Sequence, residues 1–138
     1  MKVDKSQIEA FIPQRAPFIM VDNLIEATEE QFETDFRVLS DNIFLEGATL
    51  REFALIENIA QSCAAGIAFL NRHIGNDPKD GLMGGLTRLK VHQLPKVNDL
   101  IHTRITVKHQ LGTMYLCKGE NYVGNEIQLE CEIKLVGL

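Results

Sequence analysis

Apolar and polar positions alternate along much of this chain, and the alternation predicts where the backbone is extended. In residues 31–38, Phe32, Thr34, Phe36 and Val38 alternate with charged side chains, as in a half-buried strand. The clearest pattern lies in residues 126–136, where one face would carry Ile127, Leu129, Cys131, Ile133 and Leu135. Further extended runs are expected at residues 18–27, 82–92, 100–110 and 113–122.

One stretch departs from this alternation and predicts a long helix. Residues 53–70 read FALIENIAQSCAAGIAFL, and Glu57 is the only charged side chain among them. Thr49 and Glu52 have the spacing of a capping box, which predicts the helix start, and a glycine and a proline end it near residue 74.

The faces of this helix indicate what surrounds it. One face is aliphatic, while a second face carries Glu57, Gln61, Ala64 and Ala68. A helix with so little polar surface must be enveloped, and short connections favour antiparallel strand pairing. We therefore predict one α+β domain over residues 1–138, with an antiparallel sheet of five or six strands wrapped around one long central helix.

Composition excludes several classes of function. The 138 residues are 45% hydrophobic and 24% charged, which is ordinary for a soluble domain. A net charge of −5 argues against nucleic acid as a partner, and polar side chains make the long helix a poor membrane span. The sequence begins with no secretory signal pattern, so we expect a cytoplasmic protein. Its cysteines, Cys63, Cys117 and Cys131, are expected to be buried reduced thiols, with no metal site and no cofactor.

Three stretches in order resemble the hotdog-fold 3-hydroxyacyl-acyl-carrier-protein dehydratases of fatty-acid synthesis. They are IPQRAPFIMVD at residues 12–22, LIENIAQ at residues 55–61 and GGLTRLKVHQLPKVND at residues 84–99. The second is similar to that family's Leu-Glu-Ala-Met-Ala-Gln helix, and the order and spacing of all three make the resemblance specific. It implies the hotdog fold, in which a sheet wraps a central helix, and dimers or larger oligomers with acyl tunnels between subunits.

The resemblance also implies a catalytic role for Glu57. In the family, the corresponding glutamate lines the tunnel and works with a histidine from the other subunit. Dehydration removes an α-proton and expels hydroxide, so it requires both a base and an acid. Gln61, one turn further on, would orient the carboxylate. The alternative is that Glu57 is an exposed carboxylate that merely suits the helix dipole.

The helix start would bind the thioester. Free backbone amides around Arg51 and Glu52 could polarise its carbonyl, because a helix N-terminus favours developing negative charge. Phe44, Gly47 and Phe53, which flank these residues, are expected to shape the substrate site.

The chain departs from the family at the catalytic histidine, which lies in a Gly-His-Phe-Pro-Gly loop before the helix. The corresponding residues 41–52 read DNIFLEGATLRE and contain no histidine, and Gln14 replaces a usually structural histidine of the first motif. The FLEG segment at residues 44–47 is similar to a variant branch found among dehydratase-like proteins of bacterial aryl-polyene pigment clusters. Glu46 is the better substitute for the histidine if the loop turns inwards towards Glu57; the alternative is a solvated loop acid.

A basic row follows the helix. Residues 81–98 contain three basic side chains and no acid, and Arg88, Lys90 and His92 recur at every second position, on one strand face. Because acyl carrier proteins are strongly acidic, Arg88 and Lys90 could dock one. The alternative is a solvated strand face.

These observations predict a dehydratase-like protein that acts on acyl thioesters in fatty-acid or polyene-type biosynthesis. Two alternatives stay open: a non-catalytic or half-catalytic subunit whose hotdog paralogue supplies the histidine, and an acyl thioesterase. The expected partners are a thioester of acyl carrier protein or coenzyme A, and a second hotdog chain in a homodimer, a heterodimer or a higher oligomer.

Overall fold

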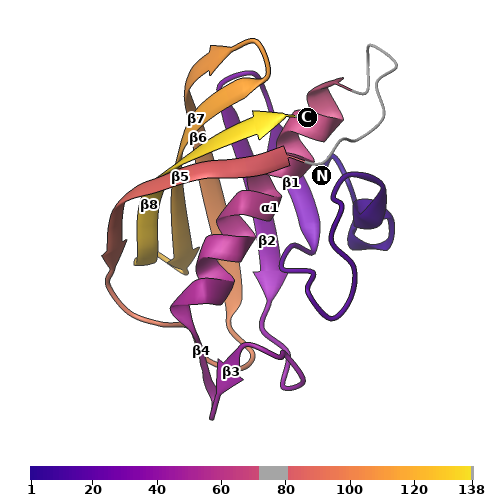
Figure 1. Ribbon diagram of the computed structural model, residues 1–138. Helices are drawn as coiled ribbons and strands as arrows, with labels where there is room; N and C mark the ends of the chain where they lie inside the picture. The colour runs from indigo at the N-terminus through magenta and orange to yellow at the C-terminus, as the bar shows by residue number, and fades with distance from the viewer. Residues whose placement is uncertain (72–80, 138) are drawn as a thin grey trace.

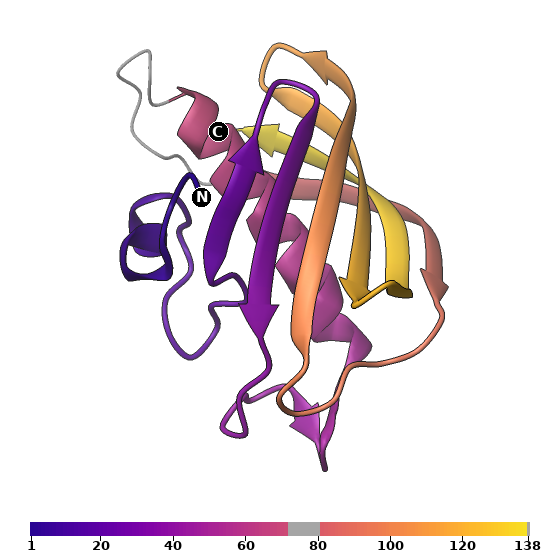
Figure 2. The same ribbon diagram turned by 180° about the vertical axis from the view of Figure 1, so that it is seen from behind.

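The computed structural model describes residues 1–71 and 81–137, so the predicted helix end near residue 74 and His73 lie outside the described residues. A six-stranded antiparallel sheet, in the order β1-β2-β6-β7-β8-β5, curls around the helix α1 (Figures 1 and 2). The predicted α+β hotdog arrangement is confirmed. The elements are the 3₁₀ helix η1 (Lys5–Ala10), β1 (Asn23–Ala27), β2 (Gln31–Arg37), β3 (Leu45–Glu46), β4 (Thr49–Leu50), α1 (Glu52–Asn71), β5 (Gly81–Val91), β6 (Leu100–Leu111), β7 (Met114–Val123) and β8 (Glu126–Gly137).

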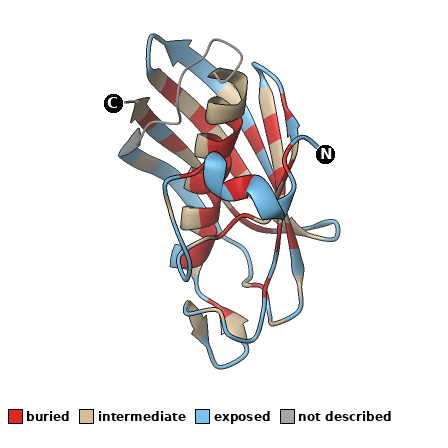
Figure 3. Ribbon diagram, turned by 90° about the vertical axis from the view of Figure 1, so that its right-hand side faces the viewer, coloured by how far each residue is buried: buried red, intermediate tan, exposed pale blue. Residues whose placement is uncertain are grey.

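The two faces of the sheet differ as the alternation predicted. Buried residues gather on α1 and on the strand faces turned towards it, coloured red in Figure 3. The outer face carries charged rows that cross the strands. One such row runs through paired positions in the order Glu33, Arg104, Glu120, Glu130 and Lys90. Mixed charges of this kind are typical of a solvated sheet surface.

The core forms between α1 and the concave face of the sheet. By length and apolar composition α1 could cross a membrane, but 50% of its most apolar window is buried inside the protein, as expected of a core helix. The three cysteines are buried free thiols, as predicted. Burial raises the pKa of Cys63 and raises that of Cys131 to about 11, so these two thiols stay protonated at neutral pH.

Residues 49–50 correct the predicted helix start. Thr49 and Leu50 form strand β4, and α1 begins at Glu52. The Leu50 amide donates a hydrogen bond to the Pro95 carbonyl, and Thr49 bridges to Lys96. These pairings with a distant loop hold the two residues extended, which a local capping motif cannot reveal.

Gly66 sets how closely α1 approaches the sheet, and its replacement is a test of the packing. A methyl group at this position would overlap the fully buried ring of Phe32. We expect Gly66→Ala to lower the free energy of unfolding by about 1–3 kcal/mol, because overpacking forces the core to shift. Denaturant unfolding measures the change.

The matched control is Gly85→Ala, since no atom lies within 4 Å of the methyl group that it adds. At position 66 the substitution also has an opposing effect, because alanine is more favourable than glycine inside a helix by about 1 kcal/mol. A Gly66→Ala variant that is more stable than the wild type would therefore show that α1 can move away from Phe32 without loss.

Candidate active site

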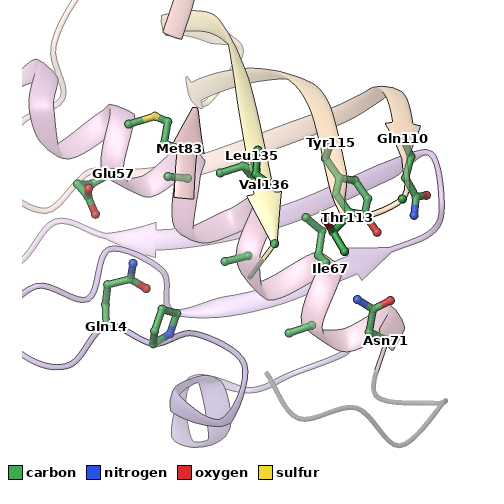
Figure 4. Close-up of a pocket in the computed structure, with 16 residues that line it drawn as sticks. Gln14, Glu57, Ile67, Asn71, Met83, Gln110, Thr113, Tyr115, Leu135 and Val136 are labelled. Atoms are coloured by element: carbon green, nitrogen blue, oxygen red, sulfur yellow. The ribbon is translucent and has the colours of Figure 1, made fainter. Parts of the chain in front are cut away.

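A pocket of about 360 Å³ runs along one flank of α1 (Figure 4). The helix wall consists largely of small side chains, which leave room between the helix and the strands. The opposite wall comes from strands β5, β6, β7 and β8, and residues 13–14 contribute one edge. The residues from α1 that line the pocket are Glu57, Ala60, Ala64, Ile67, Ala68 and Asn71.

Glu57 lies in the second turn of α1, is partly buried, and lines this pocket. In Figure 4, Glu57 and Gln14 lie at one end, and Asn71 and Gln110 lie at the other. The pocket therefore has a carboxylate at one end of a channel whose helix wall is mainly apolar. Apolar pockets with a few convergent polar groups are the usual form of a small-molecule site.

Gln61 holds the Glu57 carboxylate. The Gln61 amide nitrogen donates to Glu57 Oε2 at 3.1 Å and to the Phe18 carbonyl at 2.9 Å. The Gln61 amide oxygen accepts from the Met20 amide at 2.7 Å. Because Gln61 is fully buried and anchored to the backbone of residues 18–20, its side chain has little freedom, and the carboxylate it contacts is positioned with it.

A buried polar network beneath α1 sets the rotation of the helix. The Asn58 amide nitrogen donates to the Met20 carbonyl at 2.6 Å, and Asn58 Oδ1 accepts from Thr103 Oγ1 at 2.6 Å and from Asn121 Nδ2 at 3.0 Å. All three side chains are fully buried. Since successive helix residues are about 100° apart, directing Asn58 into the sheet places the preceding Glu57 on the flank that lines the pocket.

The sequence analysis missed this network. The aliphatic face of the helix includes Ile56, Ile67 and Leu70, yet all three are only partly buried. The available signal was a pair of polar residues, Asn58 and Ser62, four positions apart in a mainly apolar segment. The Ser62 hydroxyl donates to the Asn58 carbonyl at 2.7 Å, so the pair occupies the buried face together.

The five predicted substrate-binding residues gather at the start of α1, away from the pocket lining. The Phe44 and Phe53 rings pack with centroids 5.5 Å apart, and Arg51 pairs with Glu52 at 2.9 Å. The Arg51 amide donates to the Phe44 carbonyl at 3.1 Å. This corrects the expectation that the Arg51 amide is free for a thioester. The fifth residue, Gly47, forms the turn between β3 and β4 with a φ of +62°.

Glu46 also lies outside the pocket. Its side chain is 76% exposed in strand β3, and Arg51 lies 3.5 Å away as its ion-pair partner. Within this chain the loop therefore does not turn inwards to bring Glu46 beside Glu57, and Glu46 is placed as the alternative had it, as a solvated loop acid.

Arg88, Lys90 and His92 lie on the outer sheet face, although a β-bulge between Thr87 and Lys90 interrupts the regular alternation on which the prediction relied. Arg88 Nε lies 2.7 Å from Glu132 and His92 Nε2 lies 2.9 Å from Glu130, while Lys90 lies opposite Glu130 in the strand register. The acids of β8 thus balance the basic row, which the sequence of β5 alone could not show. Exposed pairs of this kind contribute little to stability.

The remaining titratable candidates lie elsewhere. His92, His102 and His109 are outside the Glu57 pocket, and His102 lies 3.5 Å from Glu33 on the outer face. Among residues 1–71 and 81–137, no three His, Cys, Asp or Glu side chains lie close enough to share a metal ion.

Comparison with known proteins supports this fold. A family model described as ApeP-like, ApeP dehydratase, matches residues 6–136. The 3-hydroxyacyl-[acyl-carrier-protein] dehydratase FabZ of Oceanobacillus iheyensis is 28% identical over 137 residues, which cover 95% of this chain and 96% of the relative.

Solved structures share the fold at low sequence identity. The dehydratase heterocomplex ApeI:P from Xenorhabdus doucetiae superposes with a TM-score of 0.88 at 13% identity, covering 95% of this chain and 90% of that chain. A hypothetical thioesterase with coenzyme A from Streptococcus pneumoniae has a TM-score of 0.66 at 10% identity, covering 84% of both chains. The predicted relationship to hotdog dehydratases and the dehydratase-like function are confirmed: the chain belongs to the ApeP-like dehydratase family.

Proposed function

We propose that this chain is the glutamate-bearing subunit of a cytoplasmic hotdog dehydratase that converts 3-hydroxyacyl thioesters of an acyl carrier protein to enoyl thioesters. The observation that carries the proposal is Glu57, held by Gln61 at one end of the channel along α1. Such a site suits a substrate with a reactive end and a hydrocarbon tail, as in fatty-acid or polyene-type biosynthesis.

The chemistry requires two proton transfers, and Glu57 supplies one of them. The C2–H bond breaks and its proton passes to a base, the C2=C3 double bond forms, and the C3–O bond breaks. The departing hydroxide takes a proton from an acid and leaves as water. Gln61 donates to Glu57 Oε2, and no hydrogen bond from another described residue reaches Oε1, which is left for proton exchange with the substrate.

The acyl chain would lie along the flank of α1. Fourteen residues separate Glu57 from Asn71, which corresponds to about 21 Å at the rise of an α-helix. Alanines at positions 60, 64 and 68 line this length, so the helix itself offers a smooth apolar track.

The second proton-transfer group would come from another hotdog chain. Strand β5 is an edge of the sheet, and its side chains Met83, Leu89 and Val91 are 46%, 44% and 44% exposed. Met83 and Val91 lie opposite the buried Leu135 and Leu129, so they face the helix side of the sheet beside the pocket. An unpaired edge with apolar side chains favours association with another strand.

A paralogous partner suits this edge better than a second copy. A second copy would bring the same residues 41–52, which contain no histidine. A paralogue with a histidine in that loop would complete the acid–base pair beside Glu57. The Xenorhabdus doucetiae structure, whose chains form a dehydratase heterocomplex, supports this arrangement.

Product analysis tests the proposed function. The purified chain, alone and with a hotdog paralogue that carries the histidine loop, is incubated with 3-hydroxyacyl thioesters of carrier protein and of coenzyme A. We expect mass spectrometry to show the enoyl thioester, formed mainly in the presence of the paralogue and from the carrier-protein substrate. Release of free acid as the main product would instead identify a thioesterase, and absence of both binding and product would overturn the proposal.

A further inference from the structure

Gln14 presents an unsatisfied acceptor at the pocket. Its side-chain oxygen Oε1 is buried and accepts no hydrogen bond from any residue that the structure describes. Its backbone is engaged, since the Gln14 carbonyl accepts from Arg15 Nη1 at 2.7 Å. Gln14 lines the same pocket as Glu57, and in Figure 4 the two side chains point towards each other.

A buried acceptor without a donor destabilises a folded protein, because the group has lost its hydrogen bonds to water. Within residues 1–71 and 81–137, one other buried side-chain atom shares this property, Asn121 Oδ1. That residue belongs to the core network, where its nitrogen makes two hydrogen bonds. The Gln14 side chain makes no such bond to any of the described residues, so the feature that distinguishes it is its place at the pocket.

We infer that Gln14 is a substrate-binding residue whose amide oxygen accepts a hydrogen bond from the 3-hydroxyl group of the acyl thioester. This inference rests on the proposed function. Within the acyl portion of the substrate, the 3-hydroxyl is the only O–H donor, and it is the group that reacts. A hydroxyl bound between Gln14 and Glu57 would direct its proton to the amide oxygen and a lone pair towards Glu57, which in this arrangement acts as the acid and gives its proton to the departing hydroxide.

The same hydrogen bond distinguishes substrate from product. The enoyl thioester has no 3-hydroxyl, so it leaves the Gln14 oxygen unpaired again. Sites built to bind a hydroxyl reject the analogue that lacks it, because the buried polar group then has no partner. Gln14 therefore favours binding of the hydroxylated substrate and release of the dehydrated product.

Two thioesters that differ only in the 3-hydroxyl group isolate the contact between that hydroxyl and Gln14. The chain, whose turnover without its partner is expected to be slow, is titrated with a 3-hydroxyacyl thioester and with the saturated thioester of the same length. We expect the wild type to bind the hydroxylated ligand about tenfold more tightly, and Gln14→Met to bind both about equally. Gln7→Met is the matched control, because Gln7 is an exposed residue of η1 outside the pocket, and it should keep the tenfold preference.

Thermal unfolding separates binding from a structural role. Removing an unsatisfied buried acceptor should raise the Tm of Gln14→Met, by about 2–6 °C, while the preference for the hydroxyl is lost. A residue kept for the fold would show the reverse: a lower Tm, with both ligands weakened alike. Gln14→Asn, which keeps the amide but withdraws it from the pocket, should lose the preference as well.

Three results would overturn the inference. They are a wild type that binds both ligands equally, variants that retain the preference, and a lower Tm with uniform weakening. A wild type that binds neither thioester would overturn the proposed function itself, and its failure is thereby distinguishable from that of Gln14 alone.

Discussion

Glu57→Gln is expected to lower the rate of dehydration by about 100- to 10,000-fold in the complex with the histidine-bearing partner, because it removes one of the two proton-transfer groups. Glutamine has the same size and can still accept the hydrogen bond that Gln61 donates to Oε2. The fold and the affinity for the acyl thioester should therefore change little. Single-turnover measurements of enoyl thioester formation would record the chemical step directly.

Glu46→Gln is the control for this variant. Glu46 is exposed and lies outside the pocket, so its neutralisation should leave the single-turnover rate within about twofold of the wild type. A large loss for Glu46→Gln with none for Glu57→Gln would assign the chemistry to the hairpin before α1 and refute the role of Glu57.

The second large effect concerns the partner. Adding a hotdog paralogue with a Gly-His-Phe-Pro loop should raise the dehydration rate by about 100- to 10,000-fold over this chain alone, since it restores the missing acid–base group. Mutation of that histidine should abolish the gain without disturbing the complex. Turnover by the chain alone at a rate typical of enzymes would mean that Glu57 works with a group of this chain.

The edge strand provides the matched interface test. Val91→Lys places a charge on the helix side of β5, where the partner is proposed to pack, and should prevent both association and the rate gain. Thr106→Lys on β6, an exposed and more central position in the sheet, should leave both unchanged. Size-exclusion chromatography of the mixed subunits would measure the association.

The strands could be predicted because their signal is local. Each run of alternating residues, such as residues 126–136, contains the information that one side is buried. Residues 18–22 could not be placed in this way. They are apolar enough for a strand, yet β1 begins at Asn23, because the backbone at Phe18 and Met20 instead bonds to Gln61 and Asn58.

The contact between Gln61 and Glu57 could be predicted, because it follows from helical spacing. Glu57 and Gln61 lie one turn apart, and the structure brings their side chains together. The Arg51 amide was predicted to be free, and this was wrong. Its hydrogen bond to the Phe44 carbonyl depends on the fold of the hairpin before α1, which the helix sequence does not reveal. Gln14 was noted only as the replacement of a histidine, since the burial of its oxygen depends on packing that no motif encodes.

The polar network beneath α1 has a consequence for engineering. Buried hydrogen-bonded groups can often be exchanged for hydrocarbons of similar volume with a gain in heat resistance. A designer who replaced Asn58, Thr103 and Asn121 together by aliphatic residues would remove the bonds that fix the angle of the helix about its own axis. The redesigned protein would unfold at a higher temperature, but the helix would be free to rotate. The Glu57 carboxylate would then occupy a range of positions along the pocket instead of one fixed position relative to the substrate.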